Sequence, residues 1–100
     1  KKSELINYVY ILDDDEHVKG VVNLRELLAS GASTPIMDIA QEHVITTQID
    51  ANIKRVAQLF FKYNFVAMPV LDDDDRMRGI VTLRDALESV FPEMKEDEAT

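Results

Sequence analysis

The chain repeats one stretch of its own sequence at a fixed spacing. The stretch "ILDDDEHVKGVVNLRELL" begins at Ile11, and "VLDDDDRMRGIVTLRDAL" begins 59 residues later, at Val70. Each copy runs from an apolar segment through a cluster of acids to a glycine, a second apolar segment and a helix-like segment. A repeat at a fixed period indicates one structural unit used twice. The acidic cluster is therefore part of each unit's architecture.

The pattern around the repeat predicts an α/β fold. Runs of β-branched and aromatic residues on either side of the acids predict two strands joined by a turn, and a helix follows each pair. In the second half, a further strand and an amphipathic helix precede this arrangement, so the complete unit is β-α-β-β-α over about residues 38–91. The predicted strands cover residues 8–12, 18–22, 43–47, 65–71 and 76–81, and the predicted helices cover 24–30, 51–64 and 83–91.

Residues that favour helix starts precede several of these elements. Asn23 and Asp50 stand before two predicted helices as N-caps. Thr34 as an N-cap, followed by Pro35 at the first helical position, predicts a short turn of helix over residues 36–40. In the helix after Asp50, an apolar stripe indicates the side that faces the core. Its members are Ile53, Val56, Ala57, Phe60 and Phe61.

The two units are not equally represented in the sequence. The first half holds only the β-β-α part, and we expect its leading strand and helix to lie before Lys1 in a longer protein. We predict the C-terminal part of the first unit at residues 1–31, the second unit at 32–92 and an acidic tail at 93–100. The expected fold class is α/β, with tandem β-α-β-β-α units around a pseudo-twofold axis and the first unit incomplete.

Composition excludes several classes of function. The net charge is −8 and the 11 lysines and arginines form no patch, so nucleic acids and anionic membrane surfaces are repelled. No cysteine is present, which excludes disulfides and thiolate metal sites. The apolar runs are far shorter than the roughly 20 residues that span a bilayer, so we expect no membrane insertion. We also expect no catalysis, because no nucleophile–base pair is present.

Two segments resemble the CBS domains, which are regulatory modules that occur in tandem pairs. They are "YVYILDDDEHVKGVVNLRELLA" in the first unit and "FVAMPVLDDDDRMRGIVTLRDAL" in the second. Within this family, "GVVNLRELL", "TPIMDI" and "YNFVAMPV" are most similar to the cytosolic CBS pair of the MgtE-type magnesium transporters.

The resemblance implies a non-catalytic regulatory domain on the cytoplasmic side of a protein anchored in the cell membrane. It implies a transmembrane transporter domain in the same protein, a homodimer formed through the CBS units, and a response to Mg²⁺, to an adenine nucleotide such as ATP or AMP, or to both. The alternative is a generic nucleotide-binding regulator or a dimerisation module of another protein.

The resemblance also implies a nucleotide site in the second unit. In CBS domains, a threonine and an aspartate at the places of Thr82 and Asp85 bind the ribose hydroxyls. Arg84 at the helix start is a candidate phosphate contact, and a solvated arginine is the interpretation that we favour for it. The first unit has Asn23 and Glu26 there, and the longer glutamate would crowd a ribose. The same Thr-x-x-Asp pattern is also a capping box, and the sequence leaves both interpretations open. The lining residues that the resemblance implies are Thr46, Thr47, Ala67, Met68 and Pro69.

The four consecutive acids of the second unit have two interpretations. Clustered carboxylates suit Mg²⁺, which makes Asp73 and Asp74 candidate metal ligands. Aspartate is also common in exposed turns, where salt screens repulsion over about 8–10 Å. We favour the solvated turn, because the spacing lacks the alternating acids and the glycine of a Ca²⁺ loop. The resemblance points the same way: the magnesium-transporter relatives carry acids where this chain has Lys54, Asn64 and Arg84.

Overall fold

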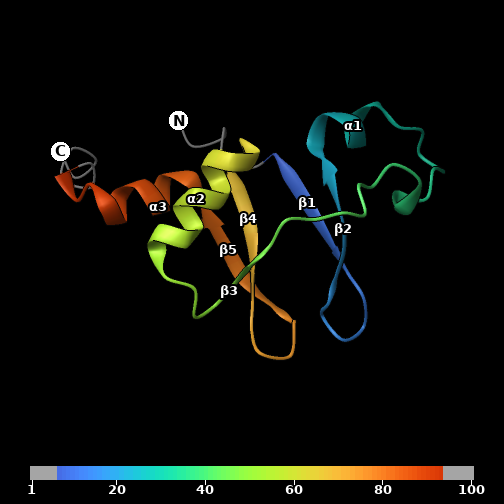
Figure 1. Ribbon diagram of the computed structural model, residues 1–100. Helices are drawn as coiled ribbons and strands as arrows, with labels where there is room; N and C mark the ends of the chain where they lie inside the picture. The colour runs from blue at the N-terminus through green and yellow to red at the C-terminus, as the bar shows by residue number, and fades with distance from the viewer. Residues whose placement is uncertain (1–6, 94–100) are drawn as a thin grey trace. The chain divides into compact units, whose positions relative to one another are not determined.

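The computed structural model describes residues 7–93, and the chain forms two compact units (Figure 1). The first unit extends to Val44 and the second begins at Ile45. The sequence-based boundary after residue 31 stays a prediction, because units defined by contacts need not coincide with sequence repeats. The predicted acidic tail lies almost entirely outside the described residues.

The first unit is built on a two-stranded antiparallel sheet. β1 (Tyr8–Leu12) pairs with β2 (Val18–Asn23), which leads directly into α1 (Leu24–Ala29). The Asn23 side chain accepts a hydrogen bond of 2.7 Å from the backbone N–H of Arg25. The predicted strands and the predicted N-cap of this unit are thereby confirmed.

A 3₁₀ turn (Ile36–Asp38) stands where a turn of helix over residues 36–40 was predicted. Pro35 is its N-cap residue, with an extended ψ of 138°, and no side chain caps it. The prediction that Thr34 is the N-cap is therefore wrong. The physical reason is that the turn begins after Pro35: its two backbone hydrogen bonds run from the N–H of Asp38 to the carbonyl of Pro35 (3.0 Å) and from the N–H of Ile39 to the carbonyl of Ile36 (3.2 Å).

After this turn the chain pairs with the outer edge of β2. Val21 and Gln41 exchange two backbone hydrogen bonds, of 3.0 and 2.9 Å. Gly20 permits this approach, because a Cβ atom at that position would lie 3.1 Å from the Cβ of Ala40. β2 thus has β1 on one side and residues 40–41 on the other.

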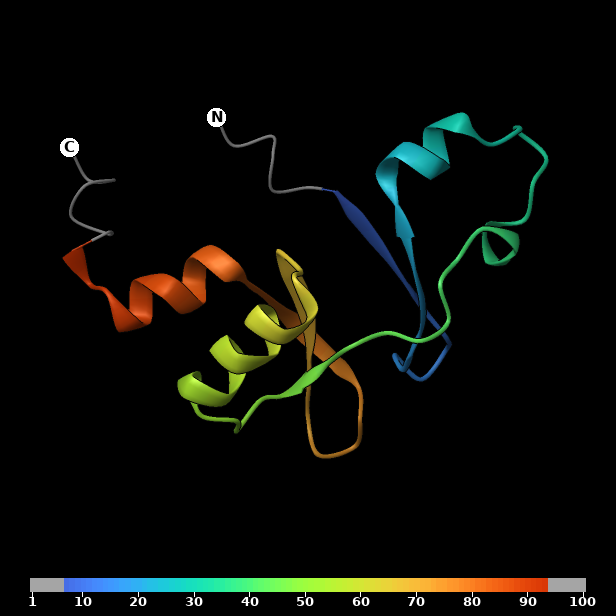
Figure 2. The ribbon, with the colours of Figure 1, turned by 45° about the horizontal axis from the view of Figure 1, so that its top comes forward.

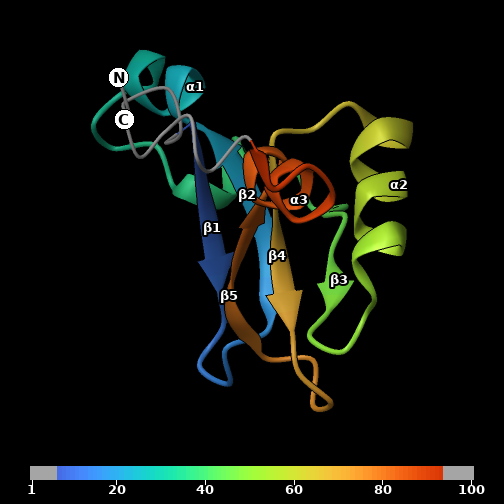
Figure 3. The same ribbon diagram turned by 90° about the vertical axis from the view of Figure 1, so that its left-hand side faces the viewer.

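The second unit contains three strands and two helices among the described residues. In chain order they are β3 (Thr47–Gln48), α2 (Ile53–Tyr63), β4 (Ala67–Leu71), β5 (Met77–Thr82) and α3 (Leu83–Val90). β4 is the central strand, parallel to β3 and antiparallel to β5 (Figure 3). The two helices pack against each other (Figure 2). This order is the predicted β-α-β-β-α unit, so the α/β fold class is confirmed.

The core of the second unit joins the helices to the central strand. Val56 and Phe60 of α2, Met68 of β4 and Ala86 of α3 are buried in one cluster. Burying a large apolar side chain contributes roughly 1.5–3 kcal/mol. The cluster therefore fixes the start of α3 against the sheet, which is where the candidate site lies.

Two boundaries in the second unit differ from the sequence-based prediction. The strand expected over residues 43–47 forms only at Thr47–Gln48, because only these residues pair with β4. The N-cap of α2 is Asn52, and the prediction of Asp50 is wrong. The Asn52 side chain accepts a hydrogen bond of 2.9 Å from the N–H of Arg55, because the helix begins after Asn52.

The predicted apolar stripe of α2 is also wrong at Phe61, and Ile53 at its start is 39% exposed. Phe60 is 2% exposed, whereas Phe61 is 92% exposed. Successive residues of an α-helix point about 100° apart, and the rotation of α2 that buries Phe60 turns Phe61 away from the core. Phe61 is left as a large apolar group on the surface.

Candidate functional site

The start of α3 carries the sharpest motif of the sequence. The backbone N–H of Thr82 donates to Oδ2 of Asp85 at 3.2 Å, and the N–H of Asp85 donates to Oγ1 of Thr82 at 3.0 Å. The two residues form a complete capping box. Each side chain satisfies a donor that the first turn of the helix leaves without an intrahelical partner.

The capping box leaves part of Asp85 available. Asp85 is exposed, and within residues 7–93 its Oδ1 atom accepts no hydrogen bond. An ionised carboxylate has about four acceptor positions, and the cap uses one. Capping and ligand binding are therefore compatible: Oδ2 holds the helix start, and Oδ1 can accept from a donor in solution.

The strand register places the other implied residues around this point. Ala67 of β4 lies directly opposite Thr82 of β5. Thr47 lies opposite Val70, three residues further along β4, which corresponds to roughly 10 Å. Thr46 precedes β3 and is half-buried. Ala67, Thr82 and Asp85 are thus grouped at one end of the sheet, and the two threonines stand on the neighbouring chain segment.

Two of the implied lining residues have side chains that are buried in the second unit. Met68 is 0% exposed and belongs to the core cluster, and Pro69 is also fully buried. Their side chains are therefore not available to a ligand at the surface. Their contribution to a nucleotide site stays a prediction, and it is limited to the backbone.

The guanidinium group of Arg84 lies beside a carboxylate group. Its Nε atom lies 3.1 Å from Oε2 of Glu88, one helical turn further on. The Glu88 oxygen is buried, and its geometry to Arg84 is an ion-pair contact without an aligned hydrogen bond. A phosphate would have to compete with Glu88 for this guanidinium group.

The acidic turn of the second unit is organised by its first aspartate. Oδ1 of Asp72 accepts hydrogen bonds from the backbone N–H groups of Asp74 (2.9 Å) and Arg76 (3.0 Å). The Arg76 bond in particular holds the pKa of Asp72 below its ordinary value. Asp75 completes the turn in the left-handed region, at φ 63°.

The first unit has the same turn 59 residues earlier. Oδ1 of Asp13 accepts from the N–H groups of Asp15 and His17, both at 2.9 Å, and the His17 bond lowers the pKa of Asp13. Glu16 is left-handed, at φ 70°. The first aspartate of each acidic run is therefore a structural acceptor. Sequence reasoning missed this role, although the tendency of aspartate to bond the backbone two residues on could have indicated it.

A cluster of two aspartates and a histidine that could hold a metal ion occurs in the first unit. Among the described residues, one such cluster is present, in which ligand atoms of Asp13, Asp15 and His17 lie within 4.8 Å of one another. The sequence candidates Asp73 and Asp74 are not part of it. Since exposed acids often cluster without an ion, the cluster itself defines no metal site.

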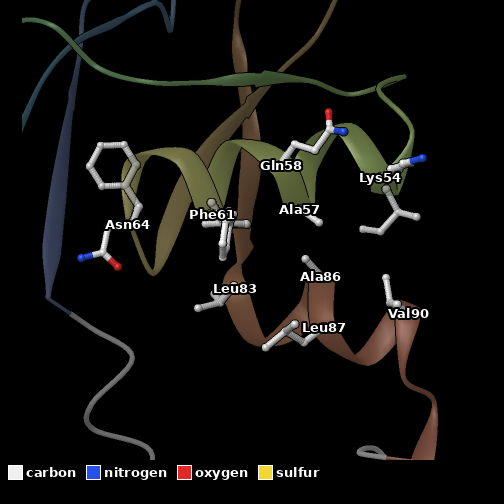
Figure 4. Close-up of a pocket in the computed structure, with 12 residues that line it drawn as sticks. Lys54, Ala57, Gln58, Phe61, Asn64, Leu83, Ala86, Leu87 and Val90 are labelled. Atoms are coloured by element: carbon white, nitrogen blue, oxygen red, sulfur yellow. The ribbon is translucent and has the colours of Figure 1, made fainter.

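An apolar groove runs between α2 and α3 (Figure 4). Its volume is about 830 Å³. The close-up shows Ala57 and Phe61 of α2 on one side and Leu83, Ala86 and Leu87 of α3 on the other. The sequence pattern placed Phe61 on the core-facing stripe, so it did not predict this groove.

The chain belongs to the CBS-domain family. The family profile matches residues 36–91, which contain all of the second unit's helices and strands. The magnesium transporter MgtE of Enterococcus faecalis is 39% identical over 95 residues, which cover 95% of this chain and 21% of that protein. The chain therefore spans about a fifth of this relative.

Two solved structures are also similar. A crystal structure described as the soluble part of a magnesium transporter has a TM-score of 0.81 at 40% identity, covering 88% of this chain and 34% of that one. The cytosolic domain of the Mg²⁺ channel MgtE in complex with ATP has a TM-score of 0.80 at 34% identity, covering 84% and 34%. Within residues 7–93, no helix is long and apolar enough to cross a bilayer.

Proposed function

We propose that this chain is the cytosolic regulatory module of a magnesium transporter, that it has no catalytic activity, and that it binds an adenine nucleotide at the start of α3. Its similarity to MgtE from Enterococcus faecalis and to two magnesium-transporter structures supports the transporter assignment. In the full-length protein, the module is joined to a transmembrane domain of the same chain.

The observation that carries the nucleotide assignment is the Oδ1 atom of the exposed residue Asp85, which accepts no hydrogen bond within residues 7–93. A ribose presents two neighbouring hydroxyl groups, and a carboxylate oxygen accepts from both without losing its cap on Oδ2. The Thr82 hydroxyl lies beside it, with its oxygen accepting from the Asp85 N–H and its proton free to be donated. The N-terminus of α3 also favours a negatively charged group, such as a phosphate.

Of the two ligands that the resemblance implies, the structure favours the nucleotide over a directly bound Mg²⁺. The first turn of α2 contains no acidic residue, and Lys54 and Arg55 stand there instead. In the acidic turn of the second unit, the acids do not act as one set of candidate metal ligands, because Oδ1 of Asp72 accepts hydrogen bonds from the backbone. We therefore assign Mg²⁺ a secondary role in this module.

The apolar groove supports a second part of the proposal, a homodimer formed through α2 and α3. Phe61 is 92% exposed at its rim, and Val90 and Phe91 are about half exposed nearby. Exposed apolar groups of this kind mark association surfaces, and a twofold dimer would bury the same patch on both copies. This observation also favours the alternative function, a dimerisation module that binds no ligand.

Calorimetric titration with ATP separates the two functions. We expect binding that is lost in Asp85→Ala and retained in Glu26→Ala, because Glu26 occupies the corresponding place in the first unit. Asp85→Asn is a further control, since an amide oxygen can keep the cap while removing the charge. If ATP does not bind at millimolar concentration, or if Asp85→Ala binds it equally well, the nucleotide proposal is wrong and the dimerisation module remains.

A further inference from the structure

The ion pair on α3 joins an exposed guanidinium group to a carboxylate that has little contact with water. Nε of Arg84 lies 3.1 Å from Oε2 of Glu88, and the exposed fractions of the two side chains are 48% and 14%. The Oε2 atom of Glu88 is buried and accepts no hydrogen bond from residues 7–93. The positive charge of Arg84 therefore compensates this carboxylate oxygen where hydrogen bonds do not.

The burial of Glu88 makes this pair difficult to open. Removing an ionised carboxylate from water costs free energy, which a nearby positive charge or hydrogen bonds must offset. If Arg84 turned toward another anion, the buried Oε2 atom of Glu88 would lose its nearby countercharge. A fully exposed pair would have no such penalty, because water would replace the lost partner. An incoming phosphate therefore finds in Arg84 a group that is costly to recruit.

The first unit provides an internal comparison. The positions 59 residues before Arg84 and Glu88 are Arg25 and Ala29. The arginine is thus present in both units, whereas the carboxylate one helical turn later is present only in the second. The second unit is also the one that has the capping box to which we assign the ribose. Glu88 therefore accompanies the proposed nucleotide site, and it is not a feature that both helix starts require.

The other charges at the start of α3 also give little advantage to a phosphate. The first turn contains Arg84 as its one basic residue and Asp85 as its one acidic residue. The Asp85 carboxylate already places a negative charge where the partial positive charge of the helix N-terminus attracts one. With Glu88 included, these three side chains carry one net negative charge. Uncharged ribose hydroxyls can bind Oδ1 of Asp85 without opposing this charge.

We propose that Glu88 is a specificity-determining residue of the nucleotide site, because it keeps Arg84 away from the 5′-phosphates of the ligand. This inference rests on the proposed function, in which Asp85 binds the ribose. It names the class of ligand that the site selects: an adenine nucleoside, recognised through its uncharged part, to which phosphates add little affinity. The selectivity comes from the buried charge that a phosphorylated ligand would leave without its partner. Adenosine should accordingly bind at least as tightly as ATP.

The test compares the dissociation constants of adenosine and ATP, measured by calorimetry on the 100-residue chain and on Glu88→Gln. This substitution keeps the size of the side chain and removes its charge. In Glu88→Gln, the affinity for ATP should rise about tenfold, as expected for one charge-assisted hydrogen bond from the released Arg84. The affinity for adenosine should stay the same. A disturbance of the fold would weaken both ligands, so the ratio of the two constants reports the competition for Arg84.

Two further variants identify the cause of the change. Glu88→Gln combined with Arg84→Gln should lose the gain in ATP affinity, because the gain requires the guanidinium group. Asp73→Asn is the matched control, since it removes one negative charge at the opposite end of β5 from Thr82, roughly 17 Å along the strand. It should leave both constants unchanged, because salt screens charges over about 8–10 Å.

The inference is overturned if ATP binds the unmodified chain more tightly than adenosine does, or if Glu88→Gln leaves the ratio of the two constants unchanged. It is also overturned if Asp73→Asn raises the affinity for ATP as much as Glu88→Gln does. In each of these cases the proposed function stands, provided that Asp85→Ala abolishes binding. If neither ligand binds at millimolar concentration, the nucleotide site itself is wrong and the inference is wrong with it.

Discussion

Thr82 and Asp85 each bond the other's backbone N–H group, and this reciprocal pair uses only one oxygen of the Asp85 carboxylate. The helix start is thereby fixed while an acceptor stays exposed beside it. Asp85 can therefore cap the helix with one carboxylate oxygen and accept a hydrogen bond from a ligand with the other. The following predictions separate these roles.

The capping role predicts a loss of stability in Thr82→Ala. The substitution removes the acceptor for the Asp85 N–H, and N-cap losses of this kind cost about 1 kcal/mol. Thr82→Ser should retain most of the stability, because it keeps the hydroxyl group. Urea unfolding followed by circular dichroism measures both, and equal midpoints for the alanine and serine variants would contradict the capping role.

The acidic turns predict a dependence of stability on pH. The pKa of Asp72 is lower in the folded chain than its ordinary value, because the Arg76 N–H bonds the carboxylate. The ionised form therefore favours folding above about pH 4, where the unfolded aspartate is also ionised, and this contribution is lost as the pH falls through the lower folded pKa. Asp13 acts in the same direction in the first unit.

The measurement is the melting temperature between about pH 5 and pH 2.5. Asp72→Asn should flatten the decline, since an amide oxygen can still accept the backbone bonds but no longer titrates. Asp73→Asn is the matched control and should leave the decline unchanged. An equal effect of the two substitutions would show that general charge repulsion, rather than the Asp72 bonds, controls the pH dependence.

The two repeat glycines predict opposite effects of the same substitution. Gly20→Ala should destabilise the first unit, because its Cβ would lie 3.1 Å from that of Ala40. Gly79→Ala should be neutral or should stabilise the second unit by up to roughly 1 kcal/mol, since the space is open and alanine loses less entropy on folding. Exchange rates of amides in each unit report the two effects separately. Destabilisation by both substitutions would contradict the open space around Gly79.

Substitutions at two adjacent phenylalanines test dimer formation and folding stability separately. Phe61→Glu should abolish dimer formation and leave the unfolding free energy nearly unchanged, because Phe61 is 92% exposed. Phe60→Ala should instead cost about 3–5 kcal/mol, as expected for a phenylalanine removed from a core. Sedimentation and urea unfolding of both variants test this. A dimer that persists in Phe61→Glu would exclude the groove as its interface.

The repeat and the alternation of apolar residues predicted the strands of both hairpins and the last helix, because these signals are local. The start of β3 depends on pairing with β4, which a single segment does not encode. Asn52 and Asp50 are equally good N-caps in sequence, and the packing of the helix selects Asn52. The burial of Phe60 rather than Phe61 is likewise a consequence of the helix's rotation toward the core.

For the candidate site, the capping box could be read directly from the Thr-x-x-Asp spacing. The pairing of Arg84 with Glu88 follows an i, i+4 spacing that is visible in the sequence. The availability of the second Asp85 oxygen could not be predicted, because it depends on which oxygen the backbone engages. The role of Asp72 was missed among four identical residues, although the tendency of aspartate to bond the backbone two residues on indicates such an acceptor in the turn.

The most direct test of the central claim is the amide spectrum of the isotopically labelled chain during addition of ATP. We predict that the signals of Thr82, Asp85 and Ala67 shift together and saturate, whereas those of Asn23 and Glu26 at the corresponding place in the first unit stay unchanged. Asp85→Ala should remove the shifts while the remaining signals show a folded chain. Equal shifts in the two units, or no saturable shift at Thr82 and Asp85, would contradict the nucleotide site at the start of α3.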